Sequence, residues 1–472
     1  MGIRRYKLVL AATGPVHIGD GSEYRKKDYF DDGGKMAILD GPAFVSKLDS
    51  HQVDAYCEFL MDKDTRVSLG DFLGKYPDMK ETALKSVLYR INTQLSRAPR
   101  GVRRFHDVKC FVKDAYGKPY VPGSSVKGML RTALVAALLE QRKDACADIV
   151  GDGFVGRACA GKLGSQIEYR MLRNDGQDSR GSDARTDYMR YVAVSDSLPL
   201  SVDDLAFAKK YDLFSKNDPV DHKVDFGGKT DYDGNEIDIY RECLKPGTRM
   251  EFEVTIDDRA DVLFGQTVDA EFLLDALRTQ ECFAERFLSA FDVPRDKSEG
   301  ASGSPGDGMC CYVLQAGPLA GSRCRNRAVE GSRYCRTHAD KAADADDVGS
   351  DEDVTRFLGG GTGFHTKTIL AALFDDDEQR VDATAQILFK RFPGWVDRSK
   401  YEHLYREMLK AGFQPKTRGA RYARNGKLIQ AKEDHRHWRD AEFGVSPHTV
   451  KMGLIGQEKY LMGECSLTLR EL

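Results

Sequence analysis

The chain lacks a long apolar run. Its most apolar stretch, "TALVAALL" at Thr132–Leu139, is much shorter than the roughly 20 residues that a membrane-spanning helix needs. The first residues, "MGIRRYKLVLAATGPV", become polar too early for a signal peptide, and Tyr6 breaks the pattern for N-myristoylation. We therefore expect neither a membrane protein nor a secreted one.

The cysteines lack the regular spacing of a disulfide framework. There are 11 of them, an odd number scattered along the chain, whereas disulfide-rich secreted domains carry even numbers at characteristic spacings. A reducing compartment is expected for such a pattern, so we predict a cytoplasmic protein.

The chain also lacks a large net charge of either sign. Its 71 basic and 74 acidic side chains nearly cancel, and this balance by itself indicates neither a nucleic-acid binder nor an enzyme for acidic substrates. The charges are nevertheless segregated along the sequence. Basic residues gather at 97–109 and 416–439, and acidic residues gather at 340–353 and 375–378. A basic surface on the folded part of the chain would not be apparent from the net charge, because acidic linkers would offset it.

Short strand patterns alternate with helix patterns, which predicts an α+β fold. Tyr6–Ala12 and Arg249–Asp257 have the alternation of half-buried strands. Met36–Asp40 is expected to pair with the first of these strands across a glycine turn. Two helices are expected near the N-terminus, at 42–61 and 79–95.

Length and composition predict two domains with long insertions. Stretches rich in Gly, Ser and Asp interrupt the periodic segments and are typical of loops and linkers. The expected division is an N-terminal domain at 1–248 with an insertion at about 151–219, a C-terminal domain at 249–294 and 354–472, and an insertion with an acidic linker at 295–353.

The segment Pro119–Leu134, "PYVPGSSVKGMLRTAL", places glycine, serines and cations at the start of an apolar helix. The spacing of its apolar residues predicts a helix that begins near Ser124 or Ser125, with Lys127 and Arg131 on one side. Hydroxyl groups, free amides at a helix N-terminus and two cations suit a phosphodiester backbone. An ordinary capped helix with surface cations fits this stretch equally well.

A second glycine-rich segment, "GGGTGFHTKT" at Gly359–Thr368, also precedes an apolar helix. Neither segment has the frame of a nucleotide-triphosphate loop or of a dinucleotide-binding fingerprint. The glycines would let a polyanion backbone approach closely, although a purely structural turn is the alternative. Two similar loop-to-helix segments suggest an internal duplication.

Five segments together resemble the RAMP proteins of CRISPR systems: "GPVHIGDG", "YVPGSSVKGMLR", "YVAVSDS", "GGGTGFHTKT" and "KMGLIGQEKYLMGECSL". Their order and the variant "YRKKDYF" look most like the fifth Csm subunit, which caps the crRNA 3′ end of type III-A effector complexes. The resemblance implies two ferredoxin-like (RRM-like) domains and binding of the crRNA backbone in antiviral defence. It also implies assembly with the repeated backbone RAMP subunit and the small subunit, with target RNA and a host trimming nuclease as further partners.

The resemblance carries the family's RNA-contacting positions onto three segments of this chain. They are the loop after the first strand, the serine-lysine helix start and the glycine-rich loop, with the residues His17, Gly19, Ser124, Ser125, Lys127, Arg131, Gly360, Gly361, Thr362, Gly363, His365 and Lys367. Spacer sequences differ from one crRNA to the next, so we expect binding that does not read bases.

We expect no enzymatic activity. A ribonuclease needs an acid–base pair or a metal held by carboxylates at the scissile phosphate, and the weak candidates are Asp28 and His17, with Asp20 and His365 less favoured. A loop Asp supports RNA cleavage in the related backbone subunits, but "RKKDYF" around Asp28 differs from their pattern. The alternative is a metal-dependent endoribonuclease or a crRNA-processing RAMP protein.

A candidate zinc site lies in the second insertion. Cys311, Cys324, Cys335 and His338 have the spacing C-x12-C-x10-C-x2-H, and the final pair can hold one side of a tetrahedral Zn²⁺ ion. The segment has almost no apolar residues, so a metal would have to hold it in one structure. Unpaired thiols in a loop are the alternative. A zinc knuckle surrounded by arginines would suit phosphate or a protein partner, so a further interpretation is an adaptor that recruits a trimming nuclease through this insertion.

Overall fold

The computed structural model describes most of the N-terminal half of the chain and the C-terminal strands. The described residues are 2–63, 67–92, 107–146, 163–173, 186–212, 239–288, 354–374 without 364, 367 and 368, and 450–472 without 457, together with short pieces between 379 and 429. They belong to one compact unit, Met1–Val293 with Val354–Leu472. None of the described helices is long and apolar enough to cross a membrane.

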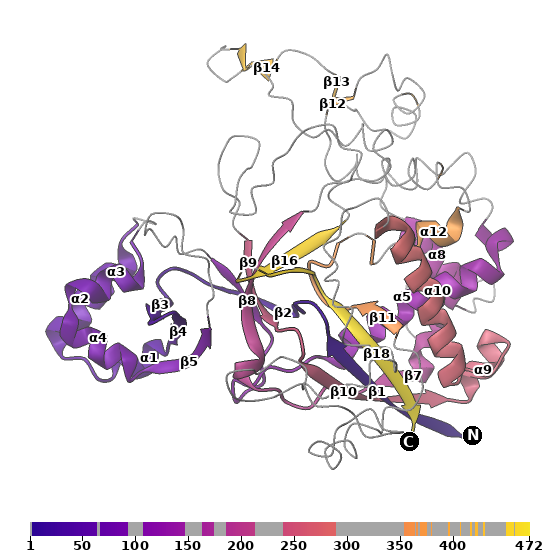
Figure 1. Ribbon diagram of the computed structural model, residues 1–472, viewed down its shortest axis with the longest axis horizontal. Helices are drawn as coiled ribbons and strands as arrows, with labels where there is room; N and C mark the ends of the chain where they lie inside the picture. The colour runs from indigo at the N-terminus through magenta and orange to yellow at the C-terminus, as the bar shows by residue number, and fades with distance from the viewer. Residues whose placement is uncertain are drawn as a thin grey trace, which may run out of the picture. The chain divides into compact units, whose positions relative to one another are not determined.

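A five-stranded sheet combines strands from both ends of the chain (Figure 1). Its order is β11–β18–β1–β10–β7, with bounds Val354–Phe357, Glu464–Glu471, Ile3–Ala12, Arg249–Asp257 and Val192–Val194. The central strand β1 pairs antiparallel with both β10 and β18. Strand β1 is therefore hydrogen-bonded on both edges only when β18, from the other end of the chain, has joined the sheet.

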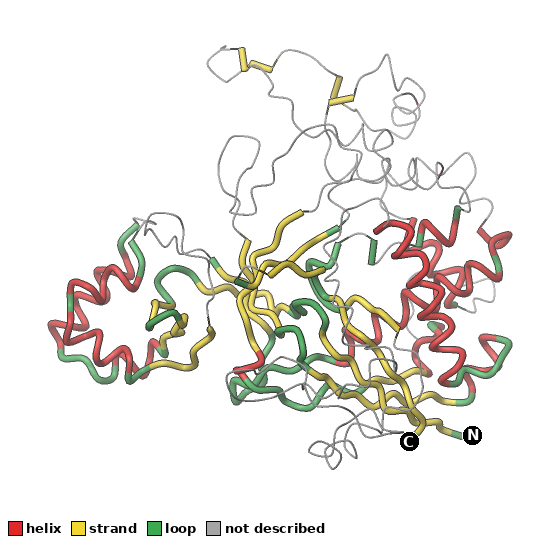
Figure 2. Tube along the Cα trace, viewed as in Figure 1, coloured by secondary structure: helices red, strands yellow, loops and turns green. Residues whose placement is uncertain are grey.

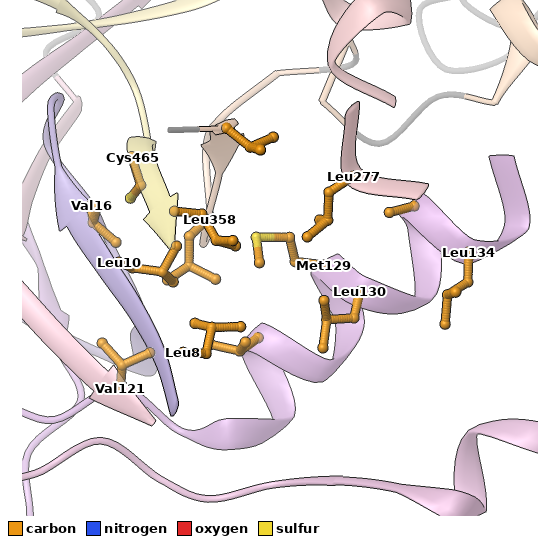
Figure 3. Packing of buried hydrophobic residues seen from close by; sticks show 14 of the residues in the cluster. Leu8, Leu10, Val16, Val121, Met129, Leu130, Leu134, Leu277, Leu358 and Cys465 are labelled. Carbon is orange, nitrogen blue, oxygen red and sulfur yellow. The ribbon is translucent and has the colours of Figure 1, made fainter. Parts of the chain in front are cut away.

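Helices cover one face of this sheet (Figure 2). They are α5 (Gly123–Gln141), α8 (Leu163–Leu172), α9 (Arg259–Phe264), α10 (Ala270–Leu288) and α12 (Leu370–Leu373). Every second residue of β1 is buried, from Tyr6 through Leu8 and Leu10 to Ala12, which is the period of a strand with one core face. Figure 3 shows Leu8 and Leu10 in the same cluster as Met129 and Leu130 of α5.

Taken without the elements that lie between them in the chain, β1, α5, β7, β10, α10 and β18 have the β-α-β-β-α-β order of a ferredoxin-like unit. The mixed helix and strand architecture that the sequence predicts is confirmed. This unit takes β1, α5 and β7 from 1–248 and the remaining elements from 249–472. A division into two ferredoxin-like domains stays a prediction, because much of the C-terminal half lies outside the described residues.

A six-stranded sheet carries the loops that matter for the site described below. Its order is β17–β16–β8–β9–β6–β2, with bounds Glu458–Leu461, Lys451–Ile455, Leu205–Asp212, Ile239–Leu244, Val108–Phe111 and Gly19–Tyr24. Strand β9 lies inside the sheet, paired antiparallel with β8 and parallel with β6. Residues 151–219, predicted as an insertion, contribute α8, β7 and β8 to the described fold.

A third, small sheet has a helical cover and a core of its own. Strands β3 (Tyr29–Asp32), β4 (Lys35–Leu39) and β5 (Val87–Asn92) pack with α1 (Gly41–Val45), α2 (Ser50–Met61), α3 (Leu69–Lys75) and α4 (Pro77–Leu84) around Phe30, Phe44, Tyr56, Phe59 and Phe72. Lys27 stabilises the C-terminus of α2, since its Nζ donates to the carbonyls of Phe59 at 2.5 Å and Asp62 at 2.7 Å. The basic "YRKKDYF" segment therefore has a structural role through Lys27.

The pairing predicted for Met36–Asp40 is wrong. The Gly33–Gly34 turn does close a hairpin, with positive φ at both residues, but the hairpin joins β3 to β4, and β1 pairs elsewhere. The sequence favours neighbours along the chain, whereas the partners of β1 come from the distant strands β10 and β18.

Two predicted helices are also shorter than expected. Residues 42–61 form α1 and α2, separated where Asp49 and Gln52 make a capping box that starts a new helix. Helix α4 ends at Leu84, and Val87–Asn92 is strand β5 because it completes the sheet beside β4.

Helix α5 begins at Gly123 rather than at a serine. Pro122 is the N-cap residue, and the backbone N–H of Gly123 donates to Asp196 Oδ1 at 2.8 Å. A Cβ atom at position 123 would lie 2.2 Å from the Val194 carbonyl oxygen and 2.4 Å from that of Ser195. Glycine is therefore needed here for close packing of the helix start against the end of β7.

We expect Gly123→Ala to lower the free energy of unfolding by about 1–3 kcal/mol, because the methyl group would overpack the backbone at β7. Gly128→Ala on the same helix is the matched control, since a Cβ there meets nothing within 4 Å. The control should raise the free energy of unfolding by up to about 1 kcal/mol through helix propensity. Urea unfolding of both variants checks this, and equal stabilities would contradict the packing argument.

Candidate nucleic-acid interface

Glu242 on β9 is a buried carboxylate with three hydrogen-bond donors. Its exposed fraction is 0%, and it accepts from Tyr89 Oη at 2.6 Å, from the Phe111 backbone N–H at 2.8 Å and from Lys113 Nζ at 2.7 Å. Burial and the Glu242 charge raise the pKa of Tyr89, so this phenol stays protonated and donates. The network joins β5 of the small sheet to β6 and β9 of the six-stranded sheet.

The backbone carbonyl of Glu242 fixes the ring of His17, which lies in the loop after β1. His17 Nδ1 is 2.7 Å from this oxygen, and a carbonyl can only accept, so Nδ1 carries the proton. Burial lowers the pKa of His17 to about 4, and the charges of Arg241 and Lys109 act in the same direction. At neutral pH the ring is therefore uncharged, with Nε2 as a hydrogen-bond acceptor.

The glycine-rich loop lies against the same histidine. The Gly360 backbone N–H donates to the His17 carbonyl oxygen at 2.7 Å, and Gly359 forms an isolated parallel bridge with His17. A Cβ at position 359 would lie 2.3 Å from the His17 oxygen, and φ is 92° there and 82° at Gly361. Close approach and left-handed backbone both require glycine at position 359, so the loop is shaped to meet this turn.

Arg241 places a positive charge beside the loop. Side chains alternate along β9, so Arg241 lies on the opposite face from Glu242. A Cβ at Gly361 would be 3.1 Å from Arg241 Cζ, and one at Gly360 would be 3.5 Å from Nη1. Burial lowers the pKa of Arg241, and its buried Nε has no hydrogen-bond partner in the described part of the chain.

The surroundings of Arg241 make it a suitable site for an anion. Within the described residues no carboxylate forms an ion pair with it, and Lys109 is its partner in the register of β6 and β9. A half-buried guanidinium beside glycine backbone can neutralise a phosphate while the backbone approaches closely. We call His17, Lys109, Arg241 and Gly359–Gly361 the cradle.

The sequence motifs do not single out Arg241 or Glu242. Both lie in "IYRECL" at Ile239–Leu244, a short strand in which a basic and an acidic residue adjoin apolar ones. Charged residues in a strand are rarely buried without a partner or a function, and this is the signal that could have found them.

The structure brings together two of the three predicted segments. The Gly360 backbone contacts His17, Gly361 lies beside Arg241, and a Cβ at Gly19 would lie 2.9 Å from His17 Nε2. The remaining loop residues shape the loop: Thr362 Oγ1 is 2.8 Å from Thr366 Oγ1, Thr366 Oγ1 donates to the Gly363 carbonyl at 3.1 Å, and the buried His365 packs edge-on against Phe357. Lys367 lies outside the described residues.

The third segment, at the start of α5, makes a separate set of contacts. Arg131 Nε donates to Glu168 Oε2 at 3.0 Å and its Nη1 to Asp187 Oδ2 at 2.7 Å, so its charge is neutralised within the protein. Burial lowers the pKa of Lys127. Ser124 is exposed, and the Ser125 backbone N–H donates to the Pro122 carbonyl at 2.9 Å. Contact of this segment with RNA stays a prediction.

The carboxylates considered for catalysis are engaged in turns. Asp28 Oδ2 accepts from the Arg25 backbone N–H at 2.7 Å, and Asp20 Oδ1 accepts from the N–H and the hydroxyl of Ser22 at 2.8 Å and 2.6 Å. In the described part of the chain no three His, Cys, Asp or Glu residues gather as a metal site would require.

The predicted zinc ligands are not part of the described structure. Cys311, Cys324, Cys335 and His338 all lie within 289–353, outside the described residues. The zinc knuckle therefore stays a prediction from their spacing.

Removing the Glu242 carboxylate should destabilise the fold. We expect Glu242→Ala to lower the free energy of unfolding by about 3–5 kcal/mol, because it leaves the Lys113 ammonium buried without an anion. Adding Lys113→Met should recover part of this loss, since the uncompensated charge is then removed. Thermal and urea unfolding check both variants, and a double variant less stable than Glu242→Ala would contradict the assignment.

The low pKa of His17 predicts a pH dependence of stability. The unfolded ring has a pKa of about 6.5 and the folded ring of about 4, so between these values the unfolded chain binds more protons. The free energy of unfolding should therefore fall as the pH decreases from 6.5 to 4, by about 3 kcal/mol through this group. The side chain in His17→Asn does not titrate, so the free energy of unfolding of this variant, measured in urea, should fall by about 3 kcal/mol less between pH 6.5 and pH 4. Equal pH slopes for the two proteins would contradict the burial of a neutral His17.

The sequence of this chain matches that of a known protein family. A family model described as RAMP superfamily matches residues 9–299, more than half of the chain. The CRISPR system Cms protein Csm5 of Mycobacterium tuberculosis is 26% identical over 269 residues, covering 54% of this chain and 67% of that protein. The protein of the same name from Streptococcus thermophilus is 24% identical over 267 residues, covering 53% of this chain and 64% of that protein.

A solved structure has a similar fold. A chain in the cryo-EM structure of a Csm-crRNA-target RNA ternary complex of a type III-A CRISPR-Cas system matches with a TM-score of 0.52 and 17% identity, covering 84% of this chain and 93% of that chain. The matched residues include the His17 loop, α5 and β9, and with them His17, Lys109 and Arg241 of the cradle, whereas Gly359–Gly361 lie beyond them. The chain therefore belongs to the RAMP superfamily.

Proposed function

We propose that this chain is a crRNA-binding subunit that caps the crRNA 3′ end in a type III-A Csm complex and contributes to complex assembly and crRNA maturation in antiviral defence. The observation that carries the proposal is the guanidinium of Arg241, half-buried beside Gly360 and Gly361 without a carboxylate partner among the described residues. The relatives named Csm5 and the fold shared with a chain of a Csm-crRNA-target RNA complex support it.

The cradle would hold one stretch of the RNA backbone. A phosphate would accept hydrogen bonds from Arg241 and from amides of the glycine loop other than that of Gly360, which donates to His17. Lys109, whose Nζ lies 3.4 Å from Glu23 Oε2, is the neighbouring cation on β6. Because the loop glycines carry no side chains, the polyanion can approach the backbone closely.

Binding that does not read bases is supported by the outer face of the five-stranded sheet. RRM-type domains stack bases on aromatic residues of such a face. Here the central strands β1 and β10 carry ion pairs instead, with Lys7 Nζ 3.0 Å from Glu251 Oε2 and Arg5 Nε 3.5 Å from Glu253 Oε1. A guide-holding subunit must accept any spacer, and backbone contacts satisfy that requirement.

We propose that the subunit is not an enzyme. Asp28 and Asp20 hold turns, and a histidine with a pKa of about 4 is a weak general base at neutral pH. The ribonuclease alternative would need one of these groups at the scissile phosphate.

The proposed partners are crRNA, the repeated backbone RAMP subunit and the small subunit, with target RNA in the assembled complex, in the cytoplasm. Recruitment of a trimming nuclease, and a structural Zn²⁺ held by Cys311, Cys324, Cys335 and His338, would belong to the insertion at 295–353. Two ferredoxin-like domains are part of the same proposal, with the β-α-β-β-α-β unit as the first.

Arg241→Ala should weaken RNA binding and reduce the slope of log Kd against log salt concentration by roughly one, as expected for one lost phosphate contact. The preference among RNA sequences should stay the same. Arg278→Ala is the matched control, because Arg278 is partly exposed on α10 and paired with Asp275. Fluorescence anisotropy at several salt concentrations measures the slopes, and a wild-type slope in Arg241→Ala would contradict the proposal.

A further inference from the structure

His17 offers a hydrogen-bond acceptor in a cradle made of donors. Because the Nδ1–H group donates a hydrogen bond to the Glu242 carbonyl oxygen at 2.7 Å, the free lone pair of the neutral ring is on Nε2. Phosphate oxygens can only accept, so Nε2 does not bind the group that Arg241 attracts. It needs a donor from another part of the ligand.

The space in front of Nε2 is kept open by Gly19. A Cβ built at position 19 would lie 2.9 Å from His17 Nε2, so any side chain there would cover the nitrogen. Only 3% of the surface of His17 is exposed, but Nε2, which has no hydrogen-bond partner in the described part of the chain, is not fully buried. Gly19 is exposed and does not have a positive φ, so backbone strain does not require glycine at this position, whereas its close approach to His17 Nε2 does.

The acceptor and the cation are close neighbours. A Cβ at Gly360 would lie 3.5 Å from Arg241 Nη1 and 3.6 Å from His17 Cδ2. Both groups therefore border the same small region beside the loop. A nucleotide whose phosphate meets Arg241 would place its sugar, rather than a variable base edge, within reach of the histidine.

We propose that His17 Nε2 accepts a hydrogen bond from a ribose 2′-hydroxyl, so that His17 is the residue that distinguishes RNA from DNA in the cradle. The inference rests on the proposed function, since it requires a nucleic-acid backbone at Arg241. The 2′-hydroxyl is a donor that every RNA nucleotide carries and DNA lacks. Its recognition adds sugar specificity without adding base specificity.

The test compares two labelled oligouridines, one of RNA and one fully substituted with 2′-fluoro groups, which keep an RNA-like sugar pucker but cannot donate. The full-length wild-type chain should bind the RNA roughly five-fold more tightly, the effect of one net hydrogen bond. His17→Asn places its amide nitrogen where Nδ1 was, so it keeps the bond to Glu242. It has no acceptor at the position of Nε2, because its carbonyl oxygen lies where Cδ2 was. This variant should bind both probes equally.

Gly19→Ala tests the same contact without changing the histidine. Its methyl group would cover Nε2, so this variant should also lose the preference for the RNA probe while its affinity for the 2′-fluoro probe stays the same. Arg241→Ala should weaken the binding of both probes by the same factor, so the ratio of their Kd values should stay as in the wild type.

The two failures are distinguishable. An RNA preference that persists in both His17→Asn and Gly19→Ala, or is missing in the wild type, would overturn the role of His17 and leave the proposed function in place. Binding that is independent of Arg241 would overturn the proposed function itself.

Discussion

The burial of the Glu242 carboxylate is the constraint on which the rest of the site depends. A buried carboxylate is stable only when its oxygens accept hydrogen bonds. Here Tyr89 on β5 of the small sheet, Phe111 at the end of β6 and Lys113 just after it supply the donors. The same residue uses its carbonyl oxygen to hold His17. Since strand residues alternate, fixing Glu242 on one face also fixes Arg241 on the other. One inward-facing acid thus positions both the acceptor and the cation of the cradle.

The cradle also depends on backbone that no side chain could replace. Gly359 and Gly361 have positive φ, and a Cβ at 359 would collide with the His17 carbonyl. The loop follows β11, an edge strand held by β18, the last strand of the chain. Segments from the start, the middle and the end of the sequence therefore meet at one place, and the site exists only in the complete fold.

Several features could be predicted from the sequence because their signal is local. Alternation in Tyr6–Ala12 and Arg249–Asp257, the apolar face of α5 and the turn-forming glycines all follow from short-range periodicity or backbone geometry. The resemblance also placed His17 and Gly360 among the RNA-contacting positions; the structure brings these two together, and their contact with RNA stays a prediction. The pairing of β1, the strand at Val87–Asn92 and the carboxylates that neutralise Arg131 are set by contacts between distant segments. The sequence does not indicate Arg241 for the same reason, since its burial and its lack of a carboxylate partner depend on the loop beside it and not on its neighbours in sequence.

The central claim is that RNA backbone lies against Arg241 and the glycine loop, and its most direct test is a structure of this chain with bound crRNA. The account predicts a phosphate within hydrogen-bond distance of the Arg241 guanidinium and of a backbone amide in Gly359–Gly361. An RNA path that runs over Ser124 and Lys127 at the start of α5 and leaves Arg241 without a phosphate would contradict it.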